Sequence, residues 1–167
     1  MSYKRDDFQS TIAGLARTPG ELASLLRDLP EEAIRSKNSP DEFSALENVC
    51  HLRDIEVEGY TVRINKILTD NKPVLADIDG GRLAIERAYN NQNVAAALES
   101  FALARKQNID LLIQINEEQV EQTGFLIGVG EITLDKLFQM MLEHDEGHLE
   151  DLRRIRQQWL RNSSTAA

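Results

Sequence analysis

The sequence has few of the residues that interrupt helices or cross-link a chain. In 167 residues it contains four prolines, nine glycines and one cysteine, Cys50. A single cysteine excludes a disulfide within the chain and a zinc site made of several thiolates. Aromatic residues make up only 5% of the chain, so we expect a mostly aliphatic core. With few helix breakers and no long alternation of β-branched side chains, most of the chain can be helical.

The sequence also lacks a long apolar run and an excess of positive charge. No stretch approaches the roughly 20 apolar residues that cross a membrane, and the first residues lack the apolar segment of a signal peptide. The net charge is −9. Such a surface argues against binding nucleic acid, which requires cationic side chains, and against docking on anionic membranes. We therefore expect a cytoplasmic protein that binds neither.

Four segments of the chain carry apolar residues at helical spacing. Three of them begin at residues that favour helix caps, namely Ser44, Asn93 and Thr133. Ser44 and Glu47 form a capping box, which we prefer to an earlier match at residues 39–42. The pattern predicts an all-α protein, a four-helix bundle. The expected helices lie near residues 3–29, 44–71, 93–116 and 133–159.

The segments between these helices are predicted to be connectors with short helical turns. Pro19 interrupts the first helix, which is therefore either one kinked helix or two short ones. The connectors are expected near residues 30–43, 72–92 and 117–130. A length of 167 residues suits one domain, which we place at residues 1–160, with a disordered tail at 161–167.

All three histidines lie where one metal ion could use them. His144 and His148 are four residues apart, on the apolar face of the fourth helix, so their rings can point to a common centre. A facing helix can add His51. Three imidazole ligands with an open fourth position are typical of a catalytic zinc site. The alternative is that each ring is a core histidine satisfied by hydrogen bonds.

Several other residues have two possible interpretations. Asp54 is the best candidate to hold the second ring nitrogen of His51, and Asp145 and Asp151 could do the same for His148. Each acid could instead belong to a solvated face. Gly147 either lets a ligand or helix approach or is simply tolerated. Arg105 on the third helix could bind a substrate anion or an acidic side chain, and Cys50 is expected to be a buried apolar residue.

Two motifs resemble signatures of a known family. Residues 43–56 resemble the second-helix signature of the DinB/YfiT-like superfamily, in which an aromatic residue and serine precede His-Leu-x-Asp-x-Glu. Residues 144–148 resemble its fourth-helix signature. The resemblance extends over about residues 40–155. Phe43 replaces the usual tryptophan, and we expect this difference to matter for packing only.

The resemblance implies a bundle with a three-histidine metal site formed by His51, His144 and His148. It implies a divalent metal ion, nickel or zinc, with iron and manganese as alternatives. The implied function is that of a metal-dependent enzyme on a small-molecule substrate, either a hydrolase or a transferase that uses a low-molecular-weight thiol. Many relatives are homodimers, so we expect a homodimer. The rival hypotheses are a non-catalytic metal-binding or interaction bundle, and a bundle whose metal site has decayed.

Overall fold

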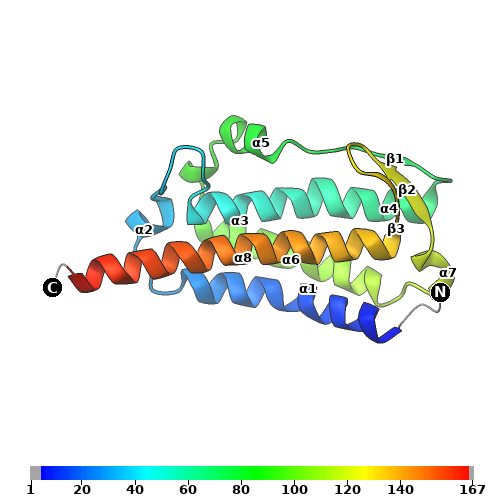
Figure 1. The fold of residues 1–167 in the computed structure, drawn as a ribbon, viewed down its shortest axis with the longest axis horizontal. Helices are drawn as coiled ribbons and strands as arrows, with labels where there is room; N and C mark the ends of the chain where they lie inside the picture. Colours follow the sequence, from blue (N-terminus) through cyan, green and yellow to red (C-terminus); the bar gives the residue numbers. More distant parts are fainter. Residues whose placement is uncertain (1–4, 166–167) are drawn as a thin grey trace.

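The computed structural model describes residues 5–165, with side chains for residues 8–164. Four long helical segments run along one axis (Figure 1). The first and last run in one direction and the middle two in the other. The segments are α1 (Arg5–Leu26), the continuous stretch α3 (Ala45–Asp54), η1 (Ile55–Tyr60) and α4 (Thr61–Thr69), then α6 (Val94–Leu112) and α8 (Leu134–Thr165).

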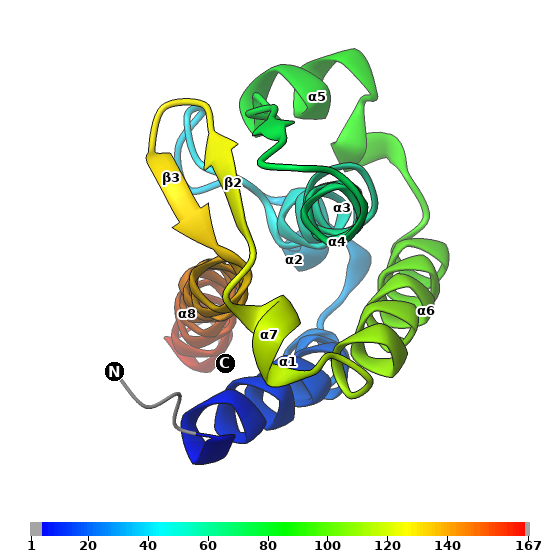
Figure 2. The ribbon, with the colours of Figure 1, turned by 90° about the vertical axis from the view of Figure 1, so that its right-hand side faces the viewer.

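The bundle does not place its helices in chain order. Both α1 and α3 pack against α6 and α8, so α1 and α3, which follow each other in the chain, lie diagonally across the bundle (Figure 2). As a result α3 is a direct neighbour of α8. These are the two helices that carry the histidines.

The second long helix begins as its sequence predicts and then departs from α-helical geometry. The Ser44 side chain accepts from the Glu47 amide at 3.1 Å, and the Glu47 carboxylate accepts from the Ser44 amide at 2.8 Å, which confirms the capping box. The segment η1 is a π-helix, in which each turn contains an additional residue. Both the backbone amide and the hydroxyl of Thr61 donate to the Glu56 carbonyl. The pattern of apolar residues did not predict this segment.

Helix α1 is continuous through Pro19 and does not divide in two. Proline has no N–H, so the carbonyl of Leu15, four residues earlier, has no helical donor at that position. The guanidinium of Arg105 donates to this carbonyl at 2.9 Å. Pro19 therefore exposes a backbone acceptor that a side chain from α6 satisfies.

The connectors contain short helices and a small sheet. The strand order is β1-β2-β3. Strand β1 is parallel to β2, and β2 is antiparallel to β3. The pattern of apolar residues did not predict this sheet, because its strands are short and mostly half exposed. The elements are α2 (Glu31–Arg35), β1 (Val74–Leu75), α5 (Gly80–Glu86), the 3₁₀-helix η2 (Tyr89–Asn91), α7 (Glu117–Val120), β2 (Thr123–Leu126) and β3 (Gly130–Thr133).

The last helix is longer than predicted. The Thr133 hydroxyl accepts from the Lys136 amide at 3.1 Å, so Thr133 caps α8 as expected. The helix then continues through Thr165. Residues 161–165 are thus helical, where an irregular tail was expected, and residues 166–167 lie outside the described part. The expectation of a disordered tail rested on its position at the end of the chain, which does not prevent helix continuation.

Two apolar clusters fill the bundle, one towards each end. In α8, residues 134–141 belong to one cluster and residues 149–155 to the other. A layer of buried or half-buried polar side chains separates them, and the histidines lie in this layer. Among the described residues, no helix combines the length and apolar character required to cross a lipid bilayer.

Candidate metal centre

The structure brings the three histidine rings together between α3 and α8. The Nε2 atoms of His51 and His144 are 3.1 Å apart, and those of His148 and His144 are 3.2 Å apart. Candidate ligand atoms of all three lie within 4.8 Å of one another. His51 is only 9% exposed, and the other two are half-buried. Three nitrogens from two helices thus converge on one point.

The hydrogen bonds of the rings agree with a metal site. His148 Nδ1 lies 2.7 Å from Asn48 Oδ1. An amide oxygen only accepts, so Nδ1 carries the proton and the lone pair of His148 is on Nε2. Among the described residues, the buried Nδ1 atoms of His51 and His144 have no hydrogen-bond partner. A neutral imidazole has one donor and one acceptor, so the three converging Nε2 atoms cannot satisfy one another. A cation at their centre would use all three lone pairs, and the donor set therefore fits a divalent metal ion.

The protonation state of the histidines suits the same role. Burial and, to a smaller extent, a neighbouring histidine together lower the pKa of His51, His144 and His148 to about 4. All three rings are therefore neutral near pH 7. Neutral imidazole is the form that binds a metal, because the protonated ring has no free lone pair.

Two residues that the sequence analysis missed hold these rings in place. Asn48, three residues before His51, is on the same face of α3 and orients His148. Gly80, at the start of α5, packs directly on His51. A Cβ atom added to Gly80 would lie 2.2 Å from Cε1 and 2.5 Å from Nδ1 of that ring. Asn48 could have been identified from the sequence, because it is a polar residue on the buried face of its helix. Nothing in the sequence pattern indicated that residue 80 meets residue 51.

Contrary to the prediction, Asp54 does not hold the His51 ring. Its carboxylate accepts from the Tyr89 hydroxyl at 2.6 Å and from the guanidinium groups of Arg87 and Arg53, both at 2.7 Å. Asp54 lies three residues after His51 on α3, yet its carboxylate accepts hydrogen bonds from η2 and from the end of α5. Spacing on one helix could not reveal these competing donors.

The remaining candidates near the histidines also have other roles. Asp151 pairs with Arg154 at 3.1 Å on the exposed side of α8. Gly147 is exposed, and a Cβ atom there would have no neighbour within 4 Å, so no helix packs on it. Cys50 is fully buried, and burial raises the pKa of its thiol to about 11. It is an apolar core residue, as expected.

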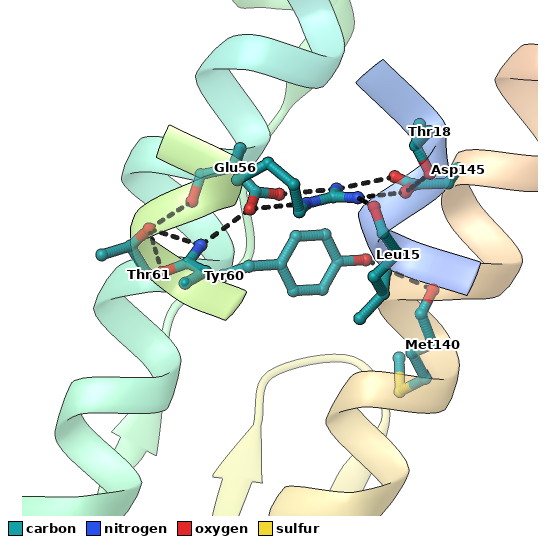
Figure 3. Close-up of polar contacts among 9 residues, drawn as sticks. Leu15, Thr18, Glu56, Tyr60, Thr61, Met140 and Asp145 are labelled. Carbon is teal, nitrogen blue, oxygen red and sulfur yellow. Dashed lines mark hydrogen bonds and ion pairs between the residues drawn. The ribbon is translucent and has the colours of Figure 1, made fainter. Parts of the chain in front are cut away.

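A cluster of buried charges includes Glu56 and Asp145, the residue that follows His144 in the chain (Figure 3). Arg105, 1% exposed, donates to the Glu56 carboxylate with two bonds of 2.8 Å and to Asp145 at 2.5 and 3.0 Å. The bond to the Leu15 carbonyl completes its set of donors. Of the two predicted roles for Arg105, the structure shows the pairing with acids. Because Asp145 follows His144, the cluster fixes α8 relative to α6 and η1 at the level of the site.

Uncharged side chains complete this cluster. Thr18 of α1 donates to Asp145 at 2.6 Å, and Asn108 of α6 donates to Glu56 at 2.7 Å. Thr61 bonds Asn108 in turn. Each carboxylate therefore has the guanidinium and one further donor. A buried ionic group is tolerated only when it is satisfied in this way.

A cavity of about 300 Å³ opens beside two of the histidines, His51 and His144. The Phe43 ring also packs on the centre, at 5.3 Å from His51 and 6.4 Å from His148 between ring centroids. Tyr60 also lines the cavity, and its ring centroid lies 5.9 Å from that of His144 at an interplanar angle of 62°. The centre is therefore accessible from the cavity at His51 and His144.

The chain resembles members of one family in sequence and in fold. A model of the DinB superfamily matches residues 15–152. None of the curated proteins matches the sequence significantly. Among solved structures, the fold is similar to YfiT from Bacillus subtilis, with a TM-score of 0.87 and 15% identity over 95% of this chain and 90% of that chain. YfiT is described as a probable metal-dependent hydrolase with an unusual four-helix bundle topology. The predicted DinB/YfiT-like bundle is thus confirmed.

Proposed function

This chain belongs to the DinB superfamily, and on that premise we propose that it is a metal-dependent hydrolase acting on a small molecule. His51, His144 and His148 would hold a divalent ion through their Nε2 atoms. The observation that carries the proposal is the convergence of these three nitrogens beside a cavity. The similarity to YfiT supports hydrolysis as the reaction. Zinc and nickel are the proposed ions, because both accept neutral imidazole ligands.

Different residues of the chain would have different roles in such a site. A divalent ion bound by these three neutral ligands would keep its charge, and would supply a lowered pKa of water and polarisation of a carbonyl group. Asn48 fixes the orientation of His148 through Nδ1. Burial raises the pKa of Tyr60 above its ordinary value, so its hydroxyl stays protonated and can donate. That hydroxyl lies 3.4 Å from the Met140 carbonyl, a weak bond that a substrate oxygen could replace.

The proposal is tested with protein purified without a histidine tag. We expect about one zinc or nickel ion per chain by elemental analysis after loading and gel filtration. The loaded protein should hydrolyse activated esters such as p-nitrophenyl acetate. Chelation should abolish this activity, and adding the ion back should restore it. A metal content that stays near zero after loading would refute the metal site. Full loading with no ester hydrolysis above the chelated control would refute hydrolysis of this ester class.

The thiol-dependent S-transferase is the second candidate. The only cysteine of the chain is buried, and its pKa is raised to about 11, so a thiol nucleophile would have to come from a co-substrate. The cavity beside His51 and His144 offers a place for it. The loaded protein is therefore assayed with a haloalkyl electrophile, with and without added free cysteine. A metal-dependent rate only when the thiol is present would favour the transferase over the hydrolase.

Gly80 provides a prediction about how the site is built. Gly80→Ala should lower zinc affinity at least tenfold, because the new methyl group would overlap the His51 ring and displace it. Gly81→Ala is the matched control, since its methyl group would meet only Asp79 Oδ1, at 3.5 Å. Both variants are measured by zinc titration against a competing chelator. Equal affinities for the two would show that the contact between residues 80 and 51 does not position the ligand.

A further inference from the structure

One cation lines the same cavity as the histidines. Arg63 of α4 borders it together with His51 and His144. Its side chain is only 10% exposed. A buried guanidinium that borders a cavity is unusual, since such groups are desolvated at a cost and are normally paired with acids. The surroundings of Arg63 therefore indicate what the cavity accepts.

The π-helix is what places Arg63 at the cavity. Twelve residues of regular α-helix turn through about 1,200°, which would leave Arg63 about 120° away from the face of His51. One additional residue in the helical count, as a π-turn supplies, removes about 100° of this difference. The segment η1 lies between the two residues. It therefore brings His51 and Arg63 onto nearly the same face of one continuous helix.

The protein holds the guanidinium in place and pairs it with one distant, exposed acid. Arg63 Nε and Nη2 donate to the Ala76 carbonyl at 3.1 and 2.8 Å, and its Cζ lies 5.7 Å from the centre of the Tyr60 ring. The nearest acid is Asp77, whose Oδ1 is 3.9 Å from Nη2. Asp77 is 75% exposed and accepts from the Ile78 amide. Within the described part of the chain, the hydrogen bonds of Arg63 use Nε and Nη2, which leaves Nη1 for a ligand.

The rest of the cavity is largely apolar. Aliphatic side chains line it, and the turn between β2 and β3 forms one wall. The neutral histidines add no negative charge, and the acid in the lining is Asp77, the exposed partner of Arg63. A molecule that complements this cavity has an apolar part and one anionic group. The apolar lining residues are Ile55, Ile78, Leu126, Ile127, Val129 and Met140.

We propose that Arg63 is a substrate-binding residue that selects small molecules with an anionic oxygen group, a carboxylate or a phosphate, next to an apolar part. This inference rests on the proposed function, because the bond to be cleaved would lie at the histidines while the anion lies at Arg63. A planar guanidinium fixed by two bonds to one carbonyl is preorganised for such a group. The π-helix thus sets the separation between the reacting centre and the anion site.

The test measures binding and does not require turnover. The probes are hexanoate, hexyl phosphate and the neutral hexanamide, titrated calorimetrically into zinc-loaded and zinc-free protein. Arg63→Gln should weaken binding of the anionic probes at least tenfold in both forms, as expected for losing a hydrogen bond to a charged group. It should leave hexanamide binding unchanged. Arg82→Gln is the matched control, because Arg82 is 66% exposed and does not line the cavity. The tighter of the two anions identifies the group.

Two further arms keep the result interpretable. Arg63→Lys retains the charge and should retain part of the anion affinity, even if Arg63→Gln proves unstable. Zinc-free protein separates Arg63 from direct binding of an anion to the metal. If the protein takes up zinc but its anion affinity is the same in Arg63→Gln as in the native chain, this inference is wrong and the metal proposal stands. If it takes up no zinc and still loses anion binding in Arg63→Gln, only the metal proposal fails.

Discussion

Replacing Arg105 with methionine should lower the free energy of unfolding by about 3–5 kcal/mol, the usual cost of removing one partner from a buried ion cluster. The side chain is 1% exposed and forms bonds with Glu56, Asp145 and the Leu15 carbonyl. Methionine replaces the aliphatic part of the side chain but leaves both carboxylates buried without a cation. The measurement is chemical denaturation of the two proteins at the same pH.

Two controls separate this effect from the loss of any arginine. Arg17→Met removes an exposed arginine whose contact with Glu21 is at 4.0 Å, and should change stability by less than about 0.5 kcal/mol. Arg105→Lys keeps the charge but not the planar set of donors, so it should fall between the native protein and Arg105→Met. A loss below about 1 kcal/mol for Arg105→Met would contradict the role assigned to the cluster.

His148→Ala should abolish stoichiometric binding of zinc, because two imidazoles remain where three nitrogens converge. Asn48→Ala should act through the same ring. It removes the acceptor 2.7 Å from His148 Nδ1 and should lower zinc affinity about 10–100-fold, as for other residues that orient a ligand. Affinity is measured by competition with a chelator of known strength.

The control for Asn48 is Asn65→Ala. Asn65 is exposed on α4 and bonds the Thr61 carbonyl in its own helix, so zinc affinity should not change. Native zinc affinity in His148→Ala would mean that this ring is not a ligand. Unchanged affinity in Asn48→Ala would mean that the hydrogen bond does not orient the ring.

Features that depend on residues close in sequence were predictable. The caps at Ser44, Asn93 and Thr133 are local, because each accepts from an amide three residues later in the chain. The spacing of His144 and His148 places both rings on one face of any helix. The two roles predicted for Arg105 included the observed one, since an arginine inside an apolar stripe must pair with an acid or bind a ligand.

Features that depend on contacts between distant segments were not predictable. Asp54 has the right spacing to reach His51, but its carboxylate instead accepts hydrogen bonds from Tyr89 and Arg87, which lie in the connector between α4 and α6. Gly80 meets His51 only because α5 folds back over α3. The π-helix is stabilised in part by the bonds of Thr61 and Glu56 to Asn108 of α6, which no pattern within the second helix contains.

The sequence by itself determined that the chain forms four amphipathic helices and that its histidines occupy two of them, because helix periodicity and capping act over a few residues. Only the tertiary structure decided how these helices pair. The diagonal placement of α1 and α3 brings α3 beside α8, and the extra residue in η1 turns Arg63 towards the same cavity. The physical reason is that side-chain packing and buried charge between helices, summed over the whole bundle, select one arrangement among several that the same four helices allow.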